Sequence, residues 1–310
     1  MRFGIHMSQK GGFSRNVKRA ARMGCRSLQI FAGNPTSWSF PRLNPEELKN
    51  RAAVLKENMI ATLVVHTPYL INLSAAKEEL HHKSKQLLRE TMERASYLSA
   101  AFVVLHIGSH RGMGFEEGLE LFISTLKEES SHWPEDVCLL LENTAGGGHS
   151  LGGSLVTVGY ILQCLAGDMP LGACLDTAHA WAAGYEISTQ KGYLAFMDDI
   201  HRHIGFKNIR ALHVNDTNTP CGTHRDRHAH LGEGLLGEEG LTAFLRNPWP
   251  EDLPAILETP EIGTDWDAVN LEKLRLYAGY DSDVGNSGNS GSGGNNAGDT
   301  DTKGTSPPEE

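Results

Sequence analysis

The sequence has few cysteines, no long apolar run and no excess of positive charge, and each absence excludes a class of protein. Its 310 residues include 5 cysteines, which are widely spread and form no CxxC pair. This pattern argues against a disulfide framework and a thiolate zinc site, and it indicates a reducing compartment, which we expect to be the cytoplasm. The N-terminus lacks the apolar region of a signal peptide, and no stretch approaches the ~20 apolar residues of a membrane span. We therefore expect no membrane partner.

The net charge of −10 at first speaks against a nucleic-acid partner. Residues 281–310 hold six acids and one base, a net −5, so residues 1–280 carry the other −5. Divalent ions bound by acids in residues 1–280 would offset that charge and change its local sign. The net charge therefore does not show whether the partner is a nucleic acid.

The last thirty residues, 281–310, are rich in Gly, Ser and Asn and contain almost no aliphatic side chains. Such a segment cannot bury enough apolar surface to offset its chain entropy, so it predicts a disordered tail. Residues 1–280 are expected to form one domain, and we expect a monomer.

Residues 1–280 alternate between short apolar runs and longer amphipathic stretches. The near-continuous apolar interiors, such as TLVVH and FVVLH, are typical of parallel strands that are covered on both faces. Eight alternations predict an α/β fold, a (β/α)₈ TIM barrel, with a doubly wound open sheet as the competing architecture. The predicted strands are residues 2–6, 27–31, 62–66, 102–106, 137–142, 171–176, 210–215 and 255–258. The predicted helices are residues 45–58, 77–100, 116–131, 154–166, 190–204 and 266–277.

Six of these eight strands carry, at or near their carboxyl ends, a side chain that can bind a metal ion. In a closed parallel barrel the carboxyl ends of all strands open on one face, so these side chains would converge there. Carboxylates and imidazoles gathered so closely would repel one another or lose hydration unless cations held them. The six are His66, His106, Glu142, Asp176, His213 and Glu258.

Two further segments add ligands. In DTAHAWAAGY, Asp176 and His179 lie three residues apart where a strand gives way to a helix. In DRHAH, ligands occur at every second residue from Asp226, and the spacing leaves His228 and His230 as alternatives, with His224 a weaker third. This nitrogen and oxygen set suits Zn²⁺, Mn²⁺, Fe²⁺ or Co²⁺ and implies two or three ions, with a bridging carboxylate.

Multinuclear sites of this kind chiefly hydrolyse phosphoesters. The sequence contains no GxxxxGK[ST] phosphate loop and no GxSxG nucleophile motif. Seven strings occur in order: HTPYLINL, LHIGSH, LLLENTAGGG, CLDTAHAWAAGY, LHVND, DRHAHLGEG and LETP. Together they closely resemble the endonuclease IV family of metal-dependent apurinic/apyrimidinic (AP) endonucleases, over residues 1–280.

The resemblance implies three zinc ions per chain, with Mn²⁺ an alternative at one site, and double-stranded DNA with abasic sites as the partner. The reaction would cleave the strand 5′ of the abasic site and leave a 3′-hydroxyl. The implied ligands are His66, His106 and Glu142 for the first ion, Glu142, Asp176, His213 and Glu258 for the second, and His179, Asp226 and His228 for the third. Glu142 or Glu258 would be catalytic, orienting the attacking hydroxide.

The resemblance also implies that Tyr69 inserts into the DNA stack. The sequence departs from the family at positions where basic side chains are common, because it has Thr36, Asn218 and His224 there. Losing such cations weakens phosphate attraction and lowers the salt dependence of binding. We therefore expect these three residues to affect the affinity for DNA more than the cleavage reaction.

Two other functions remain open. A sugar isomerase or epimerase on a related barrel would need one or two ions and a Lys or Glu poised for proton abstraction, and no predicted strand ends on Lys. A protein that binds damaged DNA with poor turnover would keep the metal-binding barrel. The lack of basic side chains at positions 36, 218 and 224 argues against this function, because it would weaken DNA binding before it affected catalysis.

Overall fold

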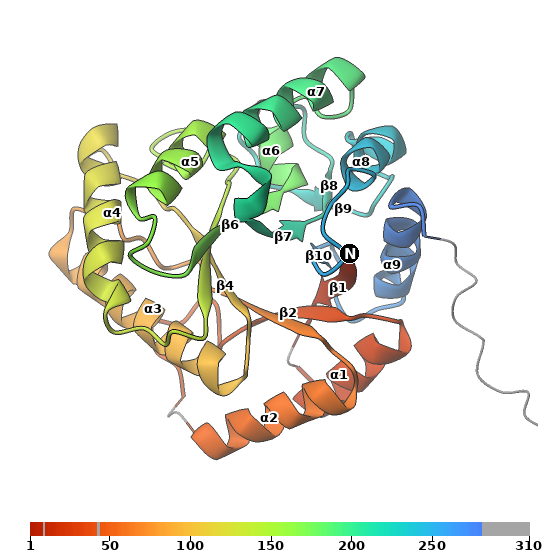
Figure 1. Ribbon diagram of the computed structural model, residues 1–310, viewed down its shortest axis with the longest axis horizontal. Helices are drawn as coiled ribbons and strands as arrows, with labels where there is room; N and C mark the ends of the chain where they lie inside the picture. The colour runs from red at the N-terminus through yellow and green to blue at the C-terminus, as the bar shows by residue number, and fades with distance from the viewer. Residues whose placement is uncertain (9, 42–43, 281–310) are drawn as a thin grey trace, which may run out of the picture.

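The computed structural model describes residues 1–8, 10–41 and 44–280, and eight parallel strands close into a barrel. Their order around the barrel is β1-β10-β7-β6-β5-β4-β3-β2, so the predicted TIM barrel is confirmed and the open sheet is wrong. Figure 1 shows helices surrounding the strands. The barrel strands are β1 (Arg2–His6), β2 (Ser27–Phe31), β3 (Thr62–His66), β4 (Phe102–His106), β5 (Cys138–Glu142), β6 (Leu171–Asp176), β7 (Ile209–His213) and β10 (Pro254–Leu257).

Each barrel strand is followed by helix or by a loop that leads to one. The α-helices are α1 (Phe13–Arg22), α2 (Pro45–Glu57), α3 (Glu78–Tyr97), α4 (Phe115–Ser130), α5 (Leu155–Cys164), α6 (Thr177–Ala183), α7 (Gln190–Asp199), α8 (Gly237–Leu245) and α9 (Trp266–Tyr277). Two short helices of other types are η1 (Ile200–Ile204) and η2 (Phe206–Asn208). A separate two-stranded antiparallel sheet joins β8 (Asp216–Thr217) to β9 (His228–Ala229).

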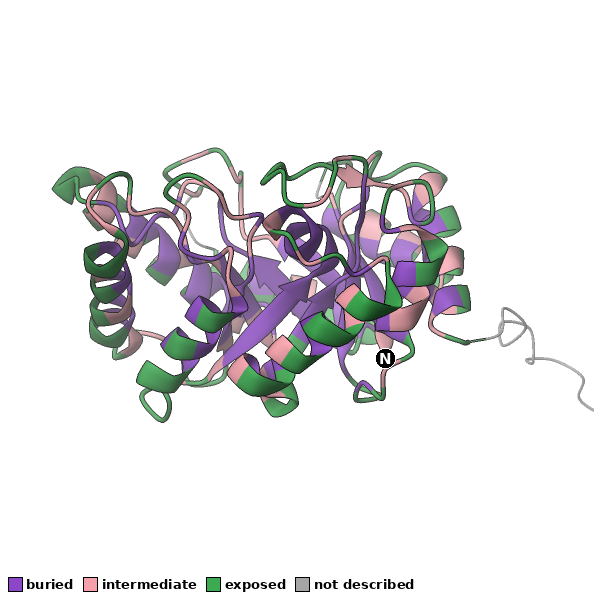
Figure 2. Ribbon diagram, turned by 90° about the horizontal axis from the view of Figure 1, so that it is seen from above, coloured by how far each residue is buried: buried purple, intermediate pink, exposed green. Residues whose placement is uncertain are grey.

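Apolar strands give the barrel two cores. Inside the barrel a small cluster is fully buried, made of Val64, Val104, Leu140, Cys174 and Ala211 from β3 to β7. The larger core lies between the outer faces of the strands and the inner faces of the helices. Figure 2 shows buried strands in the centre, and helices whose outward faces are exposed. The interior is therefore packed, and the space for a site lies at the mouth of the barrel.

Helix α2 shows how local sequence sets an element. Asn44 accepts a hydrogen bond from the backbone N–H of Glu47 at 3.2 Å, and Pro45 occupies the first helical position. The predicted helix over residues 190–204 is instead α7 followed by the π-helical turn η1, which ends at Gly205 with φ 76°. Helices α1 and α8 are not among the predicted helices, and neither has a side-chain N-cap.

Several further expectations can be compared with the described residues. All five cysteines are free thiols, as the sequence indicates. Within the described ranges, every helix is too short or too polar to cross a bilayer. The predicted disordered tail, residues 281–310, lies outside the described residues.

Candidate metal centre

The mouth of the barrel gathers the predicted ligands because five consecutive strands end on them. The last residues of β3 to β7 are His66, His106, Glu142, Asp176 and His213. In the strand register His106 lies beside Glu142, and Asp176 lies beside His213. Glu258 directly follows β10. The predicted convergence of the six strand ends is therefore what the structure shows.

Glu142 lies at the centre of this arrangement and is fully buried. Its Oε2 is 3.2 Å from His66 Nε2 and 3.0 Å from His106 Nε2. Its Oε1 is 2.8 Å from His213 Nδ1 and 3.3 Å from His179 Nδ1. One carboxylate thus faces ring nitrogens on both sides, which is the arrangement of a bridging ligand.

Two groups of ligand atoms share Glu142. The first consists of His66, His106 and Glu142, and the second of Glu142, Asp176, His213 and Glu258; within each group the ligand atoms lie within 4.8 Å of one another. In the second group, His213 Nδ1 is 3.2 Å from Glu258 Oε2 and 3.9 Å from Asp176 Oδ2. Both groups have the membership inferred from the family resemblance.

A third group combines Asp176, His179 and His228. The family resemblance implies Asp226 in place of Asp176, and the Asp226 carboxylate lies 3.2 Å from His179 Nε2 and 3.1 Å from His228 Nε2. Asp226 is half exposed, whereas Asp176 is buried and also caps α6 by accepting the backbone N–H of His179 at 2.7 Å. The structure therefore brings all nine predicted ligands together and adds Asp176 as a shared member.

The other two histidine alternatives lie elsewhere. The His230 ring stacks on Trp266 with centroids 3.8 Å apart, and its Nδ1 lies 3.0 Å from the side-chain nitrogen of Asn270. The His224 Nδ1 lies 2.9 Å from the carbonyl oxygen of Ala145. The alternation in DRHAH extends only to His228, since β9 ends one residue later at Ala229.

The histidine rings are held so that one nitrogen of each faces the cluster. A carbonyl oxygen only accepts hydrogen bonds, so the Nδ1–H groups of His66, His179 and His228 donate to backbone carbonyls at 2.7, 2.9 and 2.9 Å. Their Nε2 atoms then face the carboxylates of the cluster. Ligands of metal ions in proteins are commonly fixed by such outer hydrogen bonds.

The donor set fits divalent cations. His228 Nε2 is a buried polar atom without a hydrogen bond, although an Asp226 oxygen lies 3.1 Å away, and a bound ion would satisfy it. Burial alone would raise the pKa of the Glu142 carboxyl. The neighbouring rings of His213 and His106 instead hold this pKa well below its usual range. Burial likewise opposes ionisation of Glu258, but His213 lowers its pKa to about 2. The carboxylates are therefore charged, which suits cation binding.

Sequence reasoning missed the polar residues around the ligands. Asn215 donates to Asp176 Oδ2 at 2.6 Å, and Asn143 donates to the Asp176 carbonyl oxygen at 3.0 Å. Gln29 contacts both His6 and Glu258 from the middle of β2. A polar residue inside the otherwise apolar run SLQIF is the signal that could have identified Gln29.

A pocket of about 140 Å³ opens onto the cluster. One wall is apolar and aromatic, formed by Phe31, Tyr69 and Ile262, and the other carries cluster residues, including Glu258 but not Glu142. Tyr69 is 63% exposed and packs edge-on against Phe31, with ring centroids 5.3 Å apart. Burial raises the pKa of Tyr69 to about 12, so its hydroxyl stays neutral.

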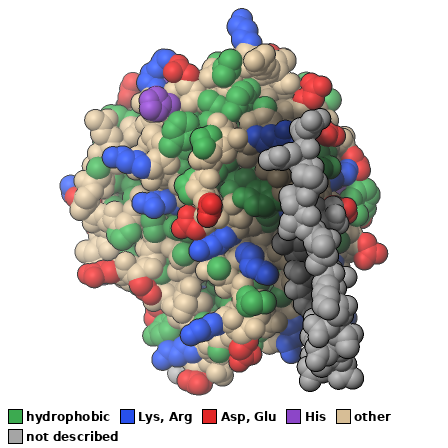
Figure 3. All heavy atoms as spheres, turned by 45° about the vertical axis from the view of Figure 1, so that its right-hand side comes forward, with side chains coloured by type: hydrophobic (Ala, Val, Ile, Leu, Met, Phe, Trp, Pro, Cys, Tyr) green, Lys and Arg blue, Asp and Glu red, His purple; other side chains and the backbone are tan. Residues whose placement is uncertain are grey.

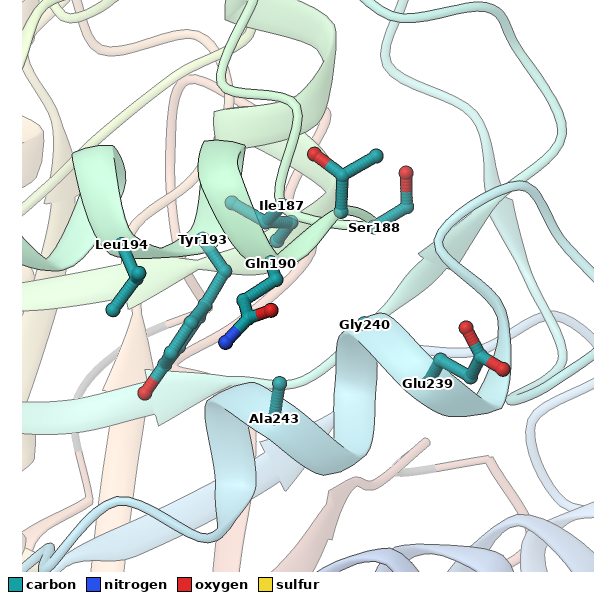
Figure 4. Close-up of a pocket in the computed structure, with 9 residues that line it drawn as sticks. Ile187, Ser188, Gln190, Tyr193, Leu194, Glu239, Gly240 and Ala243 are labelled. Carbon is teal, nitrogen blue, oxygen red and sulfur yellow. The ribbon is translucent and has the colours of Figure 1, made fainter.

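A larger cavity of about 310 Å³ lies away from the mouth, against α7 and α8. Figure 4 shows its lining, with Tyr193 and Leu194 on one side and Glu239 and Ala243 on the other. Glu239 is the only charged side chain among its lining residues. This cavity lacks the groups that catalysis would require, so the mouth of the barrel is the candidate site.

Comparisons with known proteins agree with this geometry. The family model described as a xylose isomerase-like TIM barrel matches residues 17–277. A probable endonuclease 4 from Natranaerobius thermophilus is 43% identical, covering 90% of this chain and 98% of that protein. The chain belongs to the endonuclease 4 family. A second probable endonuclease 4, from Cenarchaeum symbiosum, is 38% identical over 90% of this chain and all of that protein.

Solved structures place the endonuclease 4 family fold in a wider group. The crystal structure of endonuclease IV from Thermus thermophilus is 34% identical with a TM-score of 0.77, covering 89% of this chain and 98% of that one. A D-psicose 3-epimerase structure has a TM-score of 0.62 at 14% identity, covering 89% of this chain and 96% of that one. At that identity the epimerase shares the barrel fold alone.

Proposed function

We propose that this chain is an AP endonuclease that hydrolyses the phosphodiester bond 5′ of an abasic site in double-stranded DNA and leaves a 3′-hydroxyl. The observation that carries the proposal is the three ligand groups joined by Glu142 and Asp176 beside one pocket. The proposed ligands are the nine predicted residues, with Asp176 also contributing to the third group. We propose zinc for all three positions, with Mn²⁺ as an alternative at one of them, because the family resemblance implies zinc and nitrogen and oxygen ligands are compatible with both metals.

When bound, divalent ions would supply Lewis acidity toward the phosphate and lower the pKa of an attacking water. Of the two candidate catalytic carboxylates, Glu258 lines the pocket, whereas Glu142 is enclosed by histidine nitrogens. We therefore assign Glu142 to holding the cluster together and Glu258 to orienting the attacking water. Gln29 donates to Glu258 Oε1 at 2.6 Å, which fixes the carboxylate in this position.

The size of the pocket supports an abasic substrate. Its volume of about 140 Å³ is well below the roughly 300–1,000 Å³ of sites for drug-sized molecules. A sugar-phosphate without a base matches this space better than an intact nucleotide does. The apolar wall at Phe31 would contact the sugar, while the cluster faces the phosphate.

We propose that basic side chains near the mouth of the barrel contact the DNA phosphates. Figure 3 shows one side of the molecule on which basic and acidic side chains are interspersed. Thr36 and Asn218 are exposed, and the Thr36 hydroxyl donates to Asn34 Oδ1 at 2.9 Å. Arg225 and Arg227 are exposed on the segment that also carries Asp226, where they can meet phosphates.

The test uses purified, zinc-loaded protein and a duplex that contains one tetrahydrofuran abasic analogue. We expect a single cut 5′ of the analogue, with a product that a DNA polymerase extends directly. A matched duplex without the analogue should remain intact. Absence of cutting by protein that holds three zinc ions and binds the duplex would refute the activity, and tight binding without turnover would favour a damage-binding role.

A further inference from the structure

Gln29 connects four strands at the mouth of the barrel. It lies on β2, level with His6 on the neighbouring β1, and it is fully buried. Its side-chain nitrogen lies 3.0 Å from His6 Nδ1 and 2.6 Å from Glu258 Oε1. Its side-chain oxygen lies 2.7 Å from Nε2 of His213, which belongs to β7. All three polar contacts of this amide therefore involve the candidate site or its immediate wall.

The orientation of the Gln29 amide follows from the chemistry of its partners. A carboxylate that serves as a metal ligand only accepts hydrogen bonds, so the amide nitrogen of Gln29 must face Glu258 Oε1, which lies 2.6 Å away. The amide oxygen must then face His213, and an oxygen acceptor there requires a proton on His213 Nε2. The reversed amide would place two oxygens together and leave that proton unpaired.

This orientation decides which nitrogen of His213 can bind an ion. With the proton on Nε2, Nδ1 is the ring nitrogen left to coordinate an ion, and it lies 2.8 Å from Glu142 Oε1 and 3.2 Å from Glu258 Oε2. His66, His179 and His228 are oriented by backbone carbonyls, which no substitution of a side chain removes. His213 is oriented by a side chain instead, and the same amide also fixes a second ligand of the same group.

We propose that Gln29 is a positioning residue for the ligand group Glu142, Asp176, His213 and Glu258. It holds His213 in the Nε2–H form and points Glu258 Oε2 toward the group, so that two of four ligands are preset before an ion binds. His6 supports it by accepting the second amide hydrogen. This inference rests on the proposed metal cluster, and it concerns ion affinity independently of DNA cleavage.

The test measures zinc affinity and stoichiometry of the full chain by competition with a chromophoric chelator, with zinc alone as the probe. Gln29→Leu removes all three contacts at similar size. We expect one of three zinc ions to bind about 10–100-fold more weakly, the usual effect of losing an outer hydrogen bond to a ligand. His6→Phe leaves one amide hydrogen unpaired while both ligand contacts remain, so its effect should be less than tenfold.

Ser27→Ala is the matched control. Ser27 precedes Gln29 by two residues on β2, is fully buried, and donates to the Arg2 carbonyl oxygen at 2.6 Å. This hydrogen bond joins β2 to β1 and involves no ligand of the cluster, so zinc affinity should stay at the unmodified level. Equal affinity for all three ions in Gln29→Leu and the unmodified protein would overturn the proposal.

A second measurement needs no substitution at Gln29. In zinc-loaded protein labelled with ¹⁵N-histidine, the His213 ring should show a protonated Nε2 and a zinc-bound Nδ1; His213→Gln identifies its signal. The opposite assignment would overturn the proposal even if Gln29→Leu does not fold. If zinc affinity follows the prediction but the unmodified protein does not cut abasic DNA, the positioning role stands and the proposed function fails.

Discussion

Replacing Tyr69 by alanine tests whether the aromatic wall of the pocket holds the damaged duplex. Tyr69 is 63% exposed beside the cluster, and its ring centroid lies 6.0 Å from that of His66 and 6.4 Å from that of His106. An exposed aromatic ring at this place is available to stack on a base next to the abasic site. Its ring also contacts Phe31, so the substitution changes both DNA binding and local packing.

The expected magnitude follows from stacking. Loss of a base–aromatic stack costs about 1–3 kcal/mol. At about 1.4 kcal/mol per tenfold change, this corresponds to a roughly 5- to 150-fold increase in the enzyme concentration needed for half-maximal cleavage. Loss of the edge-on contact with Phe31 should lower the free energy of unfolding by about 0.5–1.5 kcal/mol.

The assay is single-turnover cleavage of the tetrahydrofuran duplex over a range of enzyme concentrations. Tyr69→Phe keeps the ring and removes only a hydroxyl that is neutral at ordinary pH, so it should behave like the unmodified protein. Tyr160→Ala is the matched control, because Tyr160 is 52% exposed on α5 and lies outside the pocket lining. If Tyr69→Ala and Tyr160→Ala have the same half-maximal concentration, the stacking role is refuted.

The remaining predictions concern ions and packing. Glu142→Gln should lose zinc from two ligand groups, measured by mass spectrometry, and should abolish cleavage. Its control is Glu129→Gln, which alters a buried carboxylate that is paired with basic side chains away from the cluster. This control should lower the melting temperature but keep three zinc ions. His228→Asn should retain two zinc ions and His230→Asn three, and the reverse result would show that the ligand is misassigned. Gly159→Ala should lower the melting temperature, because a Cβ there would lie 2.1 Å from the His203 carbonyl oxygen, and an unchanged melting temperature would contradict this packing.

Sequence reasoning located the barrel and most of the site because parallel strands have a simple rule. Apolar runs such as TLVVH predict strands, and the residue after the last apolar position is the one that reaches the mouth of a closed barrel. His66 and His106 follow this rule to the residue, since each ends its observed strand. Three strands start one residue away from the predicted position, at residues 138, 209 and 254. At the mouth, β7 ends at His213 and β10 at Leu257, two residues and one residue before the predicted ends, which is too little to move a ligand off the mouth.

The sequence could not separate His228 from His230 on its own, because alternation predicts the same face for both as long as the segment stays extended. The structure shows that pairing of β9 with β8 covers only His228 and Ala229, after which the chain turns and His230 stacks on Trp266. That turn depends on contacts with α9, more than thirty residues later in the chain. Local periodicity carries no information about such contacts, so a resemblance to a family was needed to choose between the two.

Gln29 presents the same difficulty in a different form. Its place in β2 predicts only that its side chain faces the barrel interior or the helices, and a buried glutamine has many ways to satisfy its amide. Its role depends on His213, which lies 184 residues away and becomes a neighbour only when the barrel closes. The ligands of a metal cluster are recognisable because their chemistry is restricted to a few residue types, whereas the residues that orient them are defined by geometry. Ion affinity in this site therefore depends on the closed barrel, and the zinc affinity of Gln29→Leu measures how much of it the ligands alone supply.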